Sequence, residues 1–210
     1  MQVITPICHI NVANYDAIIS FGNKCPTATI LRDLKIYKES YPFDYIPTTA
    51  EHIYKYIVDN TDFYPIRGSV LNKDNIWFGN FNIEDDYDNI INIFKRRFTR
   101  LYNNLGSKKR ILFVYTSEGD CWNELGNRDT NNYAALCKIR DYIREKYKYD
   151  DFLILAVHTN KEFTDVANII NYTIKVDTKY ITNDMDIFIK NGGMDLYRET
   201  LRTLFKAIFI

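Results

Sequence analysis

Short apolar runs separated by helical patterns constrain the fold of this chain more than any other feature of its sequence. Runs of strand length lie at residues 17–21, 111–115, 152–157 and 173–176, with a weaker one at 76–78. Strands that alternate with helices form mainly parallel sheets whose two faces are both covered. The sequence therefore predicts one α/β domain over residues 1–210, built in three layers in the Rossmann-like manner.

Helical patterns occupy the intervals between these runs. Pro26 suits the first position of a short helix over 26–34, because the N–H that proline lacks is not needed there. Thr48 and Glu51 have the spacing of a capping box ahead of a second helix. Apolar residues recur at helical spacing over three further segments, at 87–105, 133–147 and 196–209.

Charge balance limits the classes of partner. Twenty-seven basic side chains offset twenty-seven acidic ones, so no overall field attracts nucleic acid or an anionic membrane. No apolar run approaches the roughly 20 residues that a membrane span requires. We expect a peptide or a small molecule as the partner, with nucleic acid disfavoured and no membrane, and nothing in the sequence indicates an oligomeric state.

The cysteines indicate a reducing compartment. The four of them, at positions 8, 25, 121 and 137, show neither a C-x-x-C pair nor the spacing of zinc ligands, which predicts reduced thiols. The first twenty residues lack the basic leader and apolar core of a signal peptide. We therefore expect a cytoplasmic protein without a metal or a cofactor.

Cys25 is the most chemically suggestive residue. In Ser20-Phe21-Gly22-Asn23-Lys24-Cys25-Pro26 a strand runs through a glycine turn into a helix, which places the thiol at the N-cap. Free backbone amides and the positive end of the helix dipole favour thiolate there, and Lys24 adds positive charge. The sequence thus predicts a cysteine nucleophile, with a buried, inert thiol as the alternative.

The same turn admits a second interpretation. A glycine turn at a helix N-terminus also suits phosphate, and Gly22, Asn23 and Lys24 are then ligand-binding residues. Between 95 and 110 the chain carries seven basic residues and no acidic one. Such a stretch is more typical of a solvated helix face followed by a polar turn. In the second interpretation we expect three of these residues to bind phosphate or carboxylate, namely Arg96, Arg97 and Arg100.

Candidate partners for the thiol lie in other loops. A cysteine nucleophile needs a base, and His158, which follows the run at 152–157, could share one edge of the sheet with Cys25. Glu118 follows the run at 111–115 and is a candidate ligand-binding carboxylate. Asp184-Met185-Asp186 has the form of the D-x-D metal motif of many glycosyltransferases, but a tripeptide of this kind is more typical of a solvated loop.

Several motifs occur here in the order of a known family. Ile19-Ser20-Phe21-Gly22-Asn23-Lys24-Cys25, Leu31-Arg32 and Ser40-Tyr41-Pro42-Phe43-Asp44-Tyr45 are followed by Arg96-Arg97-Phe98-Thr99-Arg100 and Ile111-Leu112-Phe113-Val114. This series resembles a family of bacteria and large DNA viruses that is described as papain-like cysteine peptidases. The resemblance covers roughly residues 17 to 115. It implies that Cys25 is the nucleophile and Asp44 a polar partner.

The chain departs from the family at two points. Where the family carries histidine in an F-x-H-x-F context, this chain reads Phe78-Gly79-Asn80-Phe81, which places Asn80 at the position of the base. Asparagine cannot accept and return a proton near neutral pH, so His158 substitutes for it or the chain is not a peptidase. The alternation of strands and helices also suits a wound parallel sheet better than a papain-like fold.

Three functions follow. The first is a cysteine-dependent hydrolase with Cys25 as nucleophile, whose catalytic machinery is degenerate if no base replaces the missing histidine. The second is an enzyme for a nucleotide sugar or another phosphate ligand, such as a glycosyltransferase. The third is an interaction domain without catalysis, which the asparagine at position 80 favours.

Overall fold

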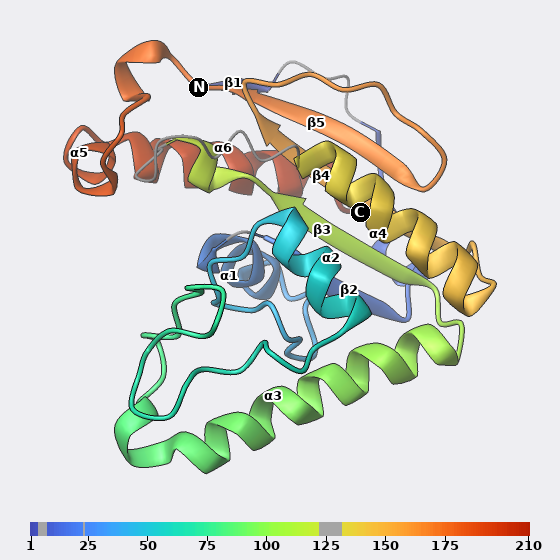
Figure 1. Ribbon diagram of the computed structural model, residues 1–210. Helices are drawn as coiled ribbons and strands as arrows, with labels where there is room; N and C mark the ends of the chain where they lie inside the picture. Colours follow the sequence, from blue (N-terminus) through green and yellow to red (C-terminus); the bar gives the residue numbers. More distant parts are fainter. Residues whose placement is uncertain (4–7, 23, 122–131) are drawn as a thin grey trace.

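A five-stranded, mostly parallel sheet forms the centre of the molecule in the computed structural model, which describes residues 1–3, 8–22, 24–121 and 132–210 (Figure 1). In sheet order the strands are β1 (Gln2–Val3), β5 (Ile169–Lys175), β4 (Phe152–Thr159), β3 (Ile111–Thr116) and β2 (Ala17–Ser20). β2 to β5 run parallel, and β1 pairs with β5 in the antiparallel direction. The predicted α/β class with a mainly parallel sheet is confirmed.

Six α-helices accompany the sheet in the described part of the chain. They are α1 (Cys25–Asp33), α2 (Ala50–Val58), α3 (Ile83–Gly106), α4 (Asn132–Tyr147), α5 (Met185–Lys190) and α6 (Gly193–Ile208). Three short 3-10 helices lie at Val12–Asn14, Glu118–Cys121 and Thr178–Tyr180. None of the helices in the described ranges is both long and apolar enough to cross a membrane.

Side-chain alternation along the strands assigns the helices to the two faces. On one face, Thr116 of β3 contacts Thr27 of α1 at 2.6 Å, and Thr159 of β4 contacts Tyr197 of α6 at 3.2 Å. Phe113, an odd-numbered residue of β3, points to the opposite face. α2, α3 and α4 cover that face (Figure 1), so the sheet is covered on both sides as expected.

Aromatic packing holds the long irregular segment between α2 and α3. The ring of Phe63 lies 5.0–5.8 Å from four other phenylalanine rings in edge-on arrangements, those of Phe43, Phe78, Phe94 and Phe98. All five side chains are fully buried. Edge-to-face packing of this kind stabilises beyond the area that it buries, so this segment is fixed without strand pairing.

Two local predictions were wrong. The capping box of α2 is made by Thr49 and His52, each side chain bonding to the other residue's backbone N–H, and not by Thr48 and Glu51. Histidine at the third helical position carries an acceptor, as glutamate does, so the box forms one residue later. Residues 76–78 form only an isolated bridge from Trp77 to Leu71.

Gly22 is required by a close approach at the start of the strand-to-helix turn. A Cβ atom at this position would lie 1.9 Å from the Thr27 hydroxyl oxygen and 3.2 Å from that of Thr116. Those two hydroxyls hydrogen-bond to each other and tie α1 to β3. Any side chain at position 22 would have to displace these hydroxyls, so glycine is strongly favoured in the turn that delivers Cys25.

Gly22→Ala should destabilise the protein by roughly 2 kcal/mol, because overpacking at a buried contact forces neighbouring groups apart. Gly106→Ala is the matched control, since nothing lies within 4 Å of a Cβ atom at that site, and it should be neutral or slightly stabilising. Urea unfolding of both variants measures the difference. Equal stability of the two would contradict the close approach.

Candidate active site

Cys25 is the first residue of α1, one position further into the helix than predicted, and its side chain is half-buried. Lys24 precedes it in an extended conformation without capping the helix, and its amine lies 3.0 Å from the Met185 sulfur of α5. The amides of a first helical turn lack intrahelical acceptors. The thiol therefore sits at the positive end of the α1 dipole.

Asn80 supplies the hydrogen-bond donor that faces this sulfur. Its Nδ2 lies 3.7 Å from the Cys25 sulfur and donates to the Tyr45 carbonyl oxygen at 2.9 Å. The two residues are 55 positions apart in the chain, and the irregular segment brings them together. No imidazole in the described part of the chain hydrogen-bonds to the sulfur, so the polar neighbour of Cys25 is an amide.

Asp44 anchors the segment that presents the Tyr45 carbonyl. Its fully buried carboxylate accepts hydrogen bonds from the Tyr37 hydroxyl at 2.5 Å, the Tyr41 N–H at 3.1 Å and the Arg32 guanidinium at 3.3 Å. Burial raises the pKa of Asp44, and these donors oppose that rise. Asp44 thus holds the backbone beside the site, and the contacts found for its carboxylate do not include the sulfur.

Arg32 is a residue of this network that the sequence reasoning did not single out. It also bonds to the Ser40 hydroxyl at 3.0 Å and to the Tyr45 hydroxyl, and its guanidinium lies 4.9 Å from the centre of the Tyr45 ring. The sequence did contain a pattern that points to Arg32, because Leu31-Arg32 and Ser40 to Asp44 are both motifs on which the family resemblance rests. The structure joins them in a single cluster.

His158 lies in a different part of the structure. It is the seventh residue of β4, on the face that α2, α3 and α4 cover, whereas α1 covers the other face. Its buried ring lies 4.6 Å from that of Phe163, and Nε2 is 2.9 Å from the Asn171 side-chain oxygen. Burial lowers the pKa of His158 to about 4. The structure does not bring this imidazole to Cys25.

Apart from the three arginines, the remaining predicted residues fall into three groups. Glu118 is fully buried in a two-point ion pair with Arg198 of α6, at 2.6 and 3.2 Å, so its carboxylate has a structural partner. Asp184 caps α5 by accepting from backbone N–H groups, which fits a solvated turn better than a metal site. Gly22 and Lys24 lie at the turn before α1, and Asn23 lies outside the described residues.

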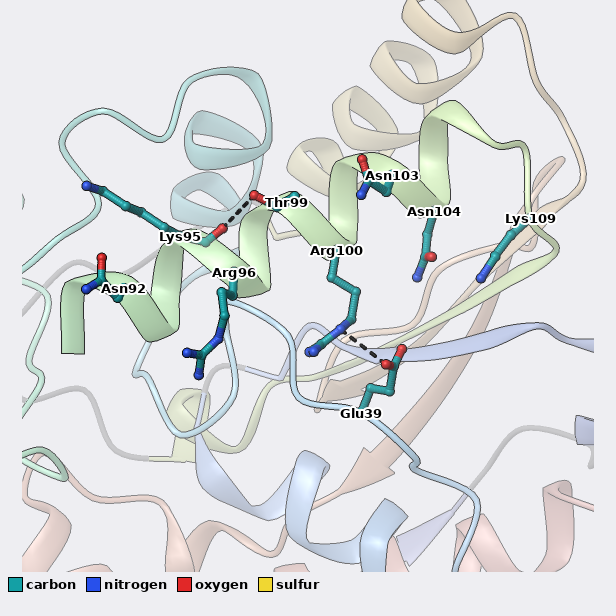
Figure 2. Close-up of a pocket in the computed structure, with 9 residues that line it drawn as sticks. All are labelled: Glu39, Asn92, Lys95, Arg96, Thr99, Arg100, Asn103, Asn104 and Lys109. Carbon is teal, nitrogen blue, oxygen red and sulfur yellow. Dashed lines mark hydrogen bonds and ion pairs between the residues drawn. The ribbon is translucent and has the colours of Figure 1, made fainter. Parts of the chain in front are cut away.

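The three arginines line two adjoining cavities beside α3, and among the described residues of the turn, Gly22, Lys24 and Cys25 line neither of them. One cavity, of about 820 Å³, is bounded by Arg96, Arg100 and Glu39 among others, and Figure 2 shows both arginines projecting toward the Glu39 side. The other, of about 460 Å³, also has Arg97 in its wall. The three arginines therefore lie apart from the thiol.

Comparison with known proteins adds no relative. No family model, no curated protein and no solved structure matches this chain. What the site does must therefore be argued from its geometry.

The titration of His158 gives a prediction about stability. Its pKa of about 4 in the folded protein lies below the ordinary 6.5, so the unfolded chain binds a proton that the native state excludes. Stability should then be lost as the pH falls from about 6.5 toward 4, by on the order of 3 kcal/mol. His158→Gln should remove that part of the pH dependence of the unfolding free energy.

His9→Gln is the matched control, because His9 is exposed. It should leave the pH dependence of chemical unfolding as in the wild type. Comparing pH 7 with pH 4.5 within each variant cancels any loss of packing that the substitution causes. A His158→Gln protein that still loses as much stability on acidification would contradict the assignment.

Asp44→Ala should destabilise the protein by about 3 kcal/mol or more, because it leaves a buried tyrosine hydroxyl and an arginine without their acceptor. Asp88→Asn removes the charge of an exposed carboxylate that pairs with Arg67 and should change stability by less than about 1 kcal/mol. Urea unfolding at pH 7 measures both. Similar midpoints for the two variants would exclude an anchoring role for Asp44.

Proposed function

We propose that this chain is a cysteine-dependent hydrolase of acyl substrates, with Cys25 as the nucleophile. The contact between Asn80 and the Cys25 sulfur carries the proposal. It joins two positions that the sequence resemblance pairs as nucleophile and base, although nothing about local sequence requires them to meet. The substrate is then a peptide or a small molecule with an activated acyl group.

The start of α1 supports the first chemical step. Attack by the Cys25 sulfur on an acyl carbon creates a negatively charged oxygen beside the first turn of the helix. Backbone N–H groups and the helix dipole stabilise such an oxyanion, and the Asn80 amide adds a side-chain donor. Cys25 is only partly buried at this position.

Asn80 also limits which substrates react. The amide donates a hydrogen bond but takes up no proton near neutral pH, so the thiol proton leaves to water and no side chain protonates the leaving group. The carbon–sulfur bond forms first, and the carbonyl electron pair moves onto oxygen to give the oxyanion. The carbonyl then re-forms and the leaving group departs with the electron pair of its bond to carbon, after which water hydrolyses the acyl-enzyme and returns the free thiol. Thioesters and activated esters meet this requirement, and amides do not.

The other features of the chain fit this assignment. Cys8, Cys25, Cys121 and Cys137 are all free thiols, and a thiol nucleophile persists in a reducing compartment. We therefore place the protein in the cytoplasm. A purely structural interaction domain would need no donor at the sulfur, and the experiment below separates the two functions.

Acylation by p-nitrophenyl acetate tests the nucleophile. We expect a burst of one p-nitrophenolate per chain, with the acetyl group on Cys25 by peptide mass mapping, followed by slow release. Cys25→Ala should abolish the burst. Cys137→Ala, which removes another partly buried free thiol, should leave it unchanged, and a burst that survives in Cys25→Ala would refute the proposal.

Asn80→His tests whether this position limits turnover. Asn80 is exposed, so an imidazole fits there and would supply the missing base. Steady-state hydrolysis should rise roughly a hundredfold and acquire a dependence on pH near the histidine pKa. Asn80→Ala controls for loss of the amide and should not accelerate turnover, and no gain in Asn80→His would exclude position 80 as the place of the base.

A further inference from the structure

We propose that the groove between α3 and residues 38–40 binds a phosphate-class anion, either free or as the phosphoester group of a small molecule. The groove holds the cavity of about 460 Å³. Four basic side chains line it together with one acid and one hydroxyl, namely Lys38, Arg96, Arg97, Arg100, Glu39 and Ser40. This site is independent of the proposed chemistry at Cys25.

Positive charge exceeds negative charge in the wall of this groove. Glu39 is the one acid that lines it, and it pairs with Arg100 at 3.3 Å. Arg96 and Lys38 form no ion pair with the residues that the structure describes, and both are exposed. The adjoining cavity adds Lys95 and Lys109 without a further acid. Like charges held this close destabilise one another, and a bound anion would relieve their repulsion.

Arg97 provides the strongest support for an anion site in this groove. Its Nη1 atom is buried, and within the described residues it has no hydrogen-bond partner. The nearby Asp44 carboxylate already accepts hydrogen bonds from Tyr37, Tyr41 and Arg32. A buried N–H without an acceptor costs about 1–3 kcal/mol, and more on a charged group. An anion in the groove would supply that acceptor once the guanidinium turns outward, because Nη1 is closed to solvent in its present position.

The geometry favours phosphate over other anions. Arg96 and Arg97 are neighbours on α3, and Arg100 lies about one turn further along the helix. Figure 2 shows Arg96 and Arg100 on the same side of it as Glu39. Guanidinium groups bind tetrahedral oxyanions through two parallel hydrogen bonds each. A phosphate group has enough oxygens to accept from two or three arginines at once, whereas the two oxygens of a carboxylate accept the paired hydrogen bonds of one guanidinium.

The lining argues against a single-stranded nucleic acid as the occupant. Sites for single strands combine basic grooves with aromatic side chains on which bases stack. Among the described residues, no aromatic side chain lines either cavity beside α3, and the chain has no net positive charge. A small phosphorylated molecule or inorganic phosphate therefore fits the groove better.

Isothermal titration with inorganic pyrophosphate at fixed ionic strength tests the proposal. We expect saturable binding of one equivalent by the wild type. Arg97→Gln and Arg96→Gln should each weaken it about tenfold or more, since each removes a charge-assisted contact. Arg97→Lys should restore only part of the affinity, because lysine keeps the positive charge but lacks the two parallel N–H donors of a guanidinium. A parallel titration with glucose 6-phosphate shows whether a phosphoester binds more tightly than the free anion.

Arg144→Gln is the matched control, because Arg144 lies on α4 in an exposed pair with Asp150, and its affinity should equal that of the wild type. Arg96 is exposed, so its variant reports on binding even if Arg97→Gln unfolds. Absence of saturation at millimolar ligand would overturn the proposal, as would equal weakening by Arg144→Gln. Binding of a 20-nucleotide single strand that pyrophosphate does not displace would also overturn it, in favour of a nucleic-acid surface.

Discussion

The buried carboxylate of Asp44 is the interaction on which both candidate sites depend. Its hydrogen bonds from Tyr37 and Tyr41 hold residues 37 to 45 together, and the one from Arg32 ties them to α1. Arg100 and Asn104 of α3 bond to the same segment, at Ser40 and Tyr41. On one side this segment presents the Tyr45 carbonyl, which orients the Asn80 amide toward the thiol. On the other side it forms the wall of the arginine groove. A buried charge is tolerable only when it is paired and hydrogen-bonded in this way.

The fold could be predicted largely from periodicity, because strands buried on both faces read as continuous apolar runs. β3 illustrates this, since all six of its residues are buried. The segment between α2 and α3 could not be predicted in the same way. Its order comes from rings such as Phe63 that meet partners far along the chain, and these contacts have no local signature.

Only those parts of the candidate site that are built from residues close together in the sequence could be predicted. The turn around Cys25 follows from a glycine between a strand and Pro26, and the contact with Asn80 was implied by the family resemblance alone. His158 failed as a partner because β4 extends to Thr159, so the residue lies within the strand instead of beyond its end. Side chains alternate between the two faces along a strand, so His158 lies on the same face as Phe152 and Ile154. That pattern alone would have assigned His158 to the buried face opposite α1.

The positions of the arginines show that the thiol and the basic residues of α3 lie in two separate places, although the sequence allowed them to serve one ligand. From the sequence, the turn at Gly22 and the basic stretch of α3 could serve one ligand. In the structure the segment 37–45 lies between them, with Asp44 facing Arg32 from α1 and Arg97 from α3. Arg32 reaches the carboxylate and leaves Arg97 without a hydrogen bond to it. Arg97 therefore lines the groove with a buried Nη1 atom that no described residue accepts from, and the chemistry proposed at Cys25 does not use it.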